Sequence, residues 1–235
     1  MTTTAPSQTA VAEARDHGPA RGILAAASGI VVTLLAFGVN VPELPDTVTA
    51  ESARAYLVDN AGALEVFGMS MAASAALLMV LLGQVRAMIA QAENGRGFLA
   101  DVAFGGGVLT AVWLLVTGAF HAATVFDGVD GLPAELVTSY YGLMSVGDTL
   151  GSASTYAKGV LMLAVGVAAI RTRALPRWLG WLSVVLGAMA VLGGLGVVEN
   201  PVTPALWYGG LIGFAVWPML VGITLIVKAI KHRRG

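Results

Sequence analysis

Six long apolar runs constrain this chain more than any other feature of its sequence. Each run is close to the ~20 residues that an α-helix needs to cross the hydrocarbon core of a bilayer. A strand of a membrane barrel would instead alternate over ~10 residues. We therefore predict an all-α fold, a polytopic membrane bundle of six transmembrane helices, at Ile23–Val39, Gly62–Leu82, Val102–Phe126, Gly147–Ile170, Trp178–Val198 and Leu206–Ile230.

The composition agrees with a chain that is surrounded by lipid. Hydrophobic residues make up 57% of the sequence and charged residues 11%, whereas a soluble domain carries about 25% charged residues. The lipid bilayer is therefore the main expected partner. A net charge of -1 gives no basic surface for nucleic acid. The chain has no Cys, and His17 and His232 lie in the tails, so the sequence indicates no metal site, no cofactor and no catalytic residue.

Basic residues lie at alternate ends of the apolar runs, which predicts the orientation of the chain. The first, third and fifth connections are acidic, and Arg54 is their one basic residue. Because loops rich in Lys and Arg stay in the cytoplasm, we expect both termini there, in a multi-pass protein of the inner (plasma) membrane of a cell. Apart from Lys158, the remaining basic residues would share that side: Arg15, Arg21, Arg86, Arg96, Arg171, Arg173, Arg177, Lys228, Lys231, Arg233 and Arg234.

The parts outside the spans divide into tails and surface helices. Residues 1–20 lack an apolar face, so we expect a disordered cytoplasmic tail before a membrane domain at 21–231 and a basic cytoplasmic tail at 232–235. In the outer connections, Ala50–Val58 is predicted to form a short interfacial helix. Pro133–Ser145 forms either a second such helix or the start of one bent helix that continues into the fourth span.

The turn after the fourth span reads Leu175-Pro176-Arg177-Trp178-Leu179-Gly180-Trp181. Together with Trp217-Pro218 and Gly222 in the last span, and with the short helix of the first outer loop, this pattern resembles an uncharacterised bacterial family of six-span membrane proteins, a domain of unknown function. The resemblance covers most of the chain. It implies a fold and no activity, and it transfers no site residue.

Lys158 is the most unusual residue, because it lies eleven residues inside the fourth span, or about 16 Å along a helix. Gly147, Gly151, Ser154 and Thr155 accompany it on one helix face, which is too small and polar to face lipid. We therefore predict that Lys158 points into the bundle and lines a polar pocket. Its candidate partners are Glu65, Asp148, backbone carbonyls and, as a neutral acceptor, His121. A direct pair with Asp148 is not expected, because that residue lies nearly three turns away on the same helix. The alternative is a lysine that snorkels to the interface.

Three other polar residues could share a pocket with Lys158 and Ser154. Glu65 lies one turn inside the second span, where it either faces the pocket or marks the water boundary. His121 lies in the third span and suits either a hydrogen bond between helices or a proton relay. Asp148 begins the fourth span, where the helix dipole favours a carboxylate.

These residues predict a binding protein rather than an enzyme. The leading hypothesis is that a pocket in the outer leaflet binds a small ligand, a lipid or a protein partner through Lys158, Glu65, His121, Asp148 and Ser154. A small solute carrier or proton-coupled transporter is the alternative. An intramembrane serine protease needs a base for its serine, and the sixth span has no His.

The sixth span also carries three closely spaced glycines, Gly209, Gly210 and Gly213. Small residues let two helices approach closely. We expect these glycines to pack against another helix of the same chain, and a homodimer is the second alternative.

The topology is the first testable prediction. All but Arg54 and Lys158 of the 13 Lys and Arg residues should lie on the cytoplasmic side. Reporter fusions after Gly95 and after Arg173 should both report the cytoplasm, and a fusion after Glu199 should report the outside. An outside signal from the Arg173 fusion would contradict the orientation.

Overall fold

The chain folds as a bundle of α-helices. A computed structural model describes residues 18–38, 48–95, 97–126, 128, 131–194 and 202–234, and these residues contain helices and no strand. The predicted all-α membrane bundle is confirmed. Five of the described helices are long and apolar enough to cross a membrane, and α2, Gly18–Gly38, has the shorter apolar part Gly22–Leu35.

Each predicted span corresponds to one helix, although most helices extend beyond the predicted limits. The longer helices carry the second to the sixth span in order, and one short helix precedes them. Their bounds are α3 at Ala50–Asp59, α4 at Ala61–Ala92, α5 at Phe98–Phe126, α6 at Ala134–Thr172, α7 at Arg177–Gly194 and α8 at Val202–Arg234.

Several boundaries differ from the sequence prediction. Of the two alternatives for residues 133–145, the one that continues into the fourth span is confirmed, because residues 134–145 are the first part of α6, which has 39 residues. At ~1.5 Å per residue this helix is about 58 Å long, so it exceeds the ~30 Å of a hydrocarbon core. Helix α2 begins at Gly18 and α8 runs to Arg234, so helix replaces parts of both predicted tails. Residues 1–17 and the predicted end of the fifth span, Val198, lie outside the described residues.

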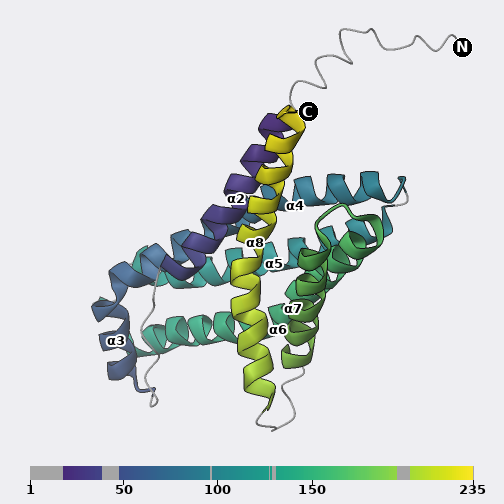
Figure 1. Cartoon of the computed structure of the whole chain (residues 1–235). Coiled ribbons are helices and arrows are strands. Elements are labelled where there is room, and N and C mark those ends of the chain that lie inside the picture. The colour runs from purple at the N-terminus through teal and green to yellow at the C-terminus, as the bar shows by residue number, and fades with distance from the viewer. Residues whose placement is uncertain are drawn as a thin grey trace, which may run out of the picture.

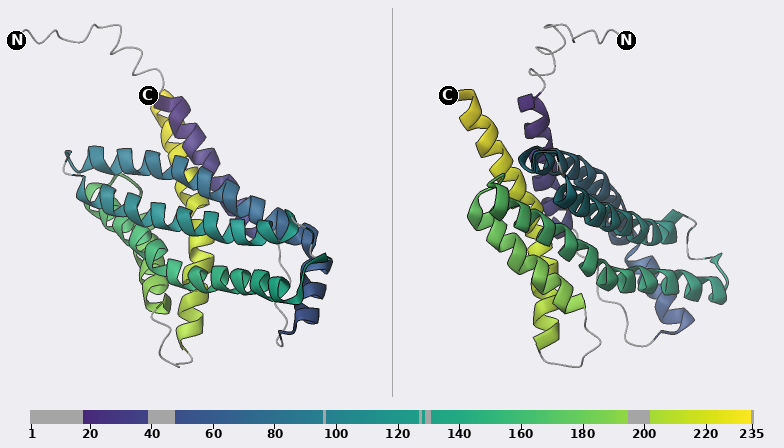
Figure 2. Two further views of the ribbon diagram at one scale, coloured as in Figure 1. Left: turned by 180° about the vertical axis from the view of Figure 1, so that it is seen from behind. Right: turned by 90° about the vertical axis from the view of Figure 1, so that its right-hand side faces the viewer.

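Helices that follow one another from α4 to α8 pack together, and α2 packs along α8. Figure 1 shows α2 and the C-terminal half of α8 side by side, with α8 continuing across α5 and α6. The start of α2 and the end of α8 lie at the same end of the molecule in all three views (Figures 1 and 2). The six crossings that the sequence predicts would give this arrangement.

Helix α3 forms a small second core at the other end of the bundle. A capping box starts it: the Ser52 backbone N–H donates to Thr49 Oγ1 at 3.1 Å, and the Thr49 N–H donates to Ser52 Oγ at 2.9 Å. Tyr56 meets the ring of Tyr141 on α6 edge to face. Arg54, the one basic residue of the outer loops, donates to the Leu132 carbonyl. The predicted surface helix therefore closes over α6.

The contact between α2 and α8 accommodates a proline inside a helix. Pro218 lies in the middle of α8, where it removes one backbone donor and disturbs the carbonyls of the preceding turn. Gly29 lets α2 reach the Pro218 carbonyl, and Thr33 Oγ1 donates to the Ala215 carbonyl at 2.7 Å. Pro218 leaves the Phe214 carbonyl, four residues before it, without a helical N–H donor, and the Thr33 hydroxyl bonds the next carbonyl along this weakened turn.

The glycines of the last span pack against α7, which confirms the predicted packing within one chain. A Cβ atom added to Gly210 would lie 2.6 Å from Ala190 Cα, and one added to Gly213 would lie 2.5 Å from a methyl group of Leu186. One turn further, the fully buried Trp217 donates its indole N–H to Ser183 Oγ at 2.8 Å. Close backbone contact and one buried hydrogen bond thus hold α7 to α8.

Replacing Gly210 by Ala should destabilise the protein, because the added Cβ meets the backbone of α7. Overpacking of this kind typically costs ~1–3 kcal/mol. Gly83→Ala is the matched control, since Gly83 is exposed on α4 and its added Cβ would meet nothing within 4 Å. Reversible unfolding in mixed detergent micelles, followed by circular dichroism, should show a loss for Gly210→Ala alone. Equal stability of the two variants would contradict the contact.

Candidate functional site

The candidate site is a cavity inside the bundle around Lys158. The cavity has a volume of about 450 Å³, and α2, α4, α5, α6 and α8 all contribute to its wall. Its lining is mainly apolar and aromatic, with Ser74 as the one hydroxyl among the described lining residues. Lys158 is 1% exposed, so the lysine points into the bundle, as the sequence predicted.

Aromatic rings surround the ammonium group of Lys158. Its Nζ lies 3.9 Å from the centre of the Trp113 ring and 5.6 Å from the centre of the Phe214 ring. Among the described residues, Nζ has neither a hydrogen-bond acceptor nor a carboxylate partner. The structure thus places π faces of α5 and α8 where the sequence predicted an acid, a histidine or a carbonyl.

The energies of burial and of the ring contacts are similar in size. A lysine at the centre of a membrane helix costs at least ~2.5–3.5 kcal/mol by insertion scales. A desolvated cation–π contact returns about 2 kcal/mol, and Trp is the best ring for it. The rings therefore offset much of the cost without supplying a negative charge.

Small residues of α6 make room for the aromatic wall. A Cβ atom added to Gly151 would lie 3.1 Å from the Trp113 ring, and one added to Gly147 would lie 3.3 Å from the Phe120 ring. The Gly147 carbonyl also accepts the Trp113 indole N–H and the Thr117 hydroxyl, each at 3.4 Å. The face of α6 with small residues, which the sequence places beside Lys158, is thus the surface on which α5 packs.

A second hollow lies between α5 and α6 on the outside of the bundle. It has a volume of about 470 Å³, and Trp113 and Ser154 belong to its lining together with the exposed Leu109 and Tyr156. Ser154 Oγ donates to the Gly151 carbonyl at 2.6 Å. Trp113 lines both this hollow and the Lys158 cavity, so its side chain lies between the hollow and the cavity.

Glu65 and His121 do not join Lys158. Glu65 is exposed on α4, and neither it nor His121 belongs to the described lining of the cavity. His121 is buried, donates from Nδ1 to the Thr117 carbonyl at 2.8 Å and meets the Phe67 ring edge to face. Asp148 lies in α6, and its side chain lies outside the described residues.

Sequence reasoning missed the two aromatic partners of the lysine. Trp113 carried a signal, because it lies in the middle of α5, whereas membrane Trp residues favour the two interfaces. Phe214 gave no such signal in the sequence, because phenylalanine is common inside membrane spans. Its role depends on which part of α8 crosses α6.

Comparison with known proteins does not assign the chain to a family. No protein-family model, no curated protein and no solved structure matches the chain. The resemblance to a six-span bacterial family therefore stays a prediction.

A double-mutant cycle measures the contact between Lys158 and Trp113. Lys158→Met should leave the protein folded and at least as stable, because it replaces a costly buried charge with an apolar chain of similar length. Trp113→Leu should destabilise wild type more than it destabilises Lys158→Met, with a coupling of about 1–2 kcal/mol. Unfolding in mixed micelles gives all four stabilities. Additive effects would show that the ring does not stabilise the cation.

Proposed function

We propose that this multi-pass membrane protein binds an anionic amphiphile, such as a medium-chain carboxylate, in the Lys158 cavity. The single observation that carries the proposal is a fully buried ammonium without a described carboxylate or hydrogen-bond partner. An anionic headgroup would supply the missing charge partner, and the apolar remainder of the ligand would fill the cavity.

The lining of the cavity suits an apolar ligand with one charged end. Met71, Leu114 and Leu211 offer apolar surface, and Ser74 adds one polar group beside them. The volume of about 450 Å³ falls within the ~300–1,000 Å³ of small-molecule sites. A fully polar anion would lose its hydration and find few donors in the described lining, namely Lys158, Ser74 and the indole N–H groups, so an amphiphile is favoured.

The surroundings of the cavity provide a route from the lipid. Ile212 lines the cavity and is 53% exposed on the outside of α8. On the opposite flank, the Trp113 ring is shared with the hollow between α5 and α6. A ligand dissolved in the bilayer could therefore reach Lys158 between helices, without passing through water.

The contacts favour binding over proton-coupled transport. The proton-coupled carrier predicted from the sequence pairs Lys158 with an acid, and the described residues give Lys158 none. We further propose that the protein lies in the plasma membrane with both termini in the cytoplasm, as the distribution of basic residues indicates.

The test measures binding of 11-bromoundecanoate to the full chain in phosphatidylcholine nanodiscs. The bromine of this acid quenches tryptophan fluorescence, which reports binding. The acid should quench the tryptophan fluorescence of wild type saturably. Lys158→Met should weaken binding about 30-fold or more, since the loss of one partner of a buried charge pair costs ~2–5 kcal/mol.

Two controls separate the pocket from simple partitioning into lipid. The methyl ester of the same acid carries no charge and should bind wild type and Lys158→Met alike. Lys228→Met removes an exposed lysine on α8 and should bind the acid like wild type. Equal binding of the acid to wild type and Lys158→Met would overturn the proposed function.

A further inference from the structure

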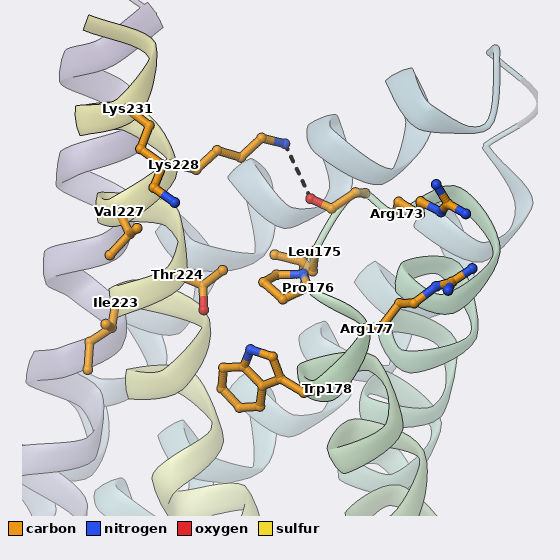
Figure 3. A pocket seen from close by; sticks show the side chains of 11 residues that line it. Arg173, Leu175, Pro176, Arg177, Trp178, Ile223, Thr224, Val227, Lys228 and Lys231 are labelled. Carbon is orange, nitrogen blue, oxygen red and sulfur yellow. Dashed lines mark hydrogen bonds between the residues drawn. The ribbon is translucent and has the colours of Figure 1, made fainter. Parts of the chain in front are cut away.

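A second site lies at the end of the bundle where the turn between α6 and α7 meets the last turns of α8. The groove there has a volume of about 880 Å³. The turn from Arg173 to Trp178 forms one side, and the segment of α8 from Ile223 to Lys231 forms the other (Figure 3). None of these residues lines the Lys158 cavity.

The backbone of the turn holds the groove open toward α8. Arg173 ends α6 in the left-handed conformation with φ 58°, and α7 starts again at Arg177 after a proline. The ammonium of Lys228 reaches across from α8 and donates to the Ala174 carbonyl at 3.3 Å (Figure 3). This bond links the two sides of the groove.

Four cations surround the groove: Arg173, Arg177, Lys228 and Lys231. All four are exposed, and none forms an ion pair with a described residue. In Figure 3 the two lysines lie on the α8 side, whereas the two arginine side chains lie beyond the turn and point away from α8. An anion in the groove would contact the lysines directly and feel the arginines at longer range.

The wall of the groove is apolar below these charges. Trp178 is 56% exposed, and its indole lies between the turn and α8 (Figure 3). Ile223 and Val227 are also exposed on the same stretch of α8. A Trp beside Lys and Arg residues is typical of the level of lipid headgroups, so the groove joins the headgroup level to the acyl-chain level.

We propose that this groove binds an anionic phospholipid. The phosphate lies between Lys228 and Lys231, and an acyl chain lies along Ile223, Val227 and the Trp178 ring. The charge of the groove is complementary to such a headgroup, and basic pockets between membrane helices suit anionic lipids. A free phosphate would leave the exposed apolar wall in contact with water.

Brominated lipids test the proposal on the full chain in nanodiscs. Phosphatidylglycerol or phosphatidylcholine with brominated acyl chains is mixed into unbrominated phosphatidylcholine, and quenching of Trp178 is the difference between wild type and Trp178→Phe. Brominated phosphatidylglycerol should quench Trp178 at lower mole fractions than brominated phosphatidylcholine. Lys228→Gln and Lys231→Gln should each lower this preference about fivefold, the factor that corresponds to ~1 kcal/mol per basic residue near an anionic surface.

Arg171→Gln is the matched control, because Arg171 is exposed at the end of α6 and does not line the groove. It should keep the preference for phosphatidylglycerol. Free glycerol phosphate should leave the quenching unchanged. Equal quenching by the two lipids would overturn the proposal. An equal loss of preference in Arg171→Gln would also overturn it, because the attraction would then come from diffuse charge. Displacement by free glycerol phosphate would overturn it as well, because the groove would then be a site for soluble phosphate.

Discussion

Close backbone contact between helices is the constraint on which the rest of this structure depends. In lipid, no hydrophobic effect drives helices together, so association relies on van der Waals packing and on polar contacts. Glycine provides that packing at nearly every interface of the bundle. An added Cβ would meet backbone atoms of the neighbouring helix at Gly29, Gly68, Gly106, Gly118, Gly159, Gly166, Gly187, Gly210 and Gly222.

The Lys158 cavity follows from where this packing is tight and where it is not. Gly159 packs on α7, where its added Cβ would lie 2.9 Å from the Gly187 carbonyl. The residue before it points ~100° away around the helix, toward Trp113 and Phe214. The face of α6 that carries Gly159 therefore packs closely against α7. The face that carries Lys158 borders a cavity lined by the aromatic rings. The aromatic side chains are too large for backbone contact there, and the cavity remains between them.

The two basic sites of the protein differ in how water reaches them. Lys158 is 1% exposed, and two aromatic rings lie near its ammonium, so an anion there would interact in a medium of low polarity. The four cations of the groove are exposed, and salt and water weaken each of their contacts. A buried single charge favours a selective, deep ligand, whereas several exposed charges beside apolar surface favour a lipid that is abundant around the protein.

The sequence by itself determined the number and place of the apolar helices, the burial of Lys158 and the packing of Gly209, Gly210 and Gly213 within the chain. These features follow from length, hydropathy and helical periodicity, which are local properties of the chain. Tertiary structure alone decided that residues 134–172 form one helix, that Glu65 faces outward and that Phe214 reaches Lys158. Periodicity states which residues share a face of a helix, but the rotation of that helix and the neighbour that its face meets are set by the packing of all the helices together.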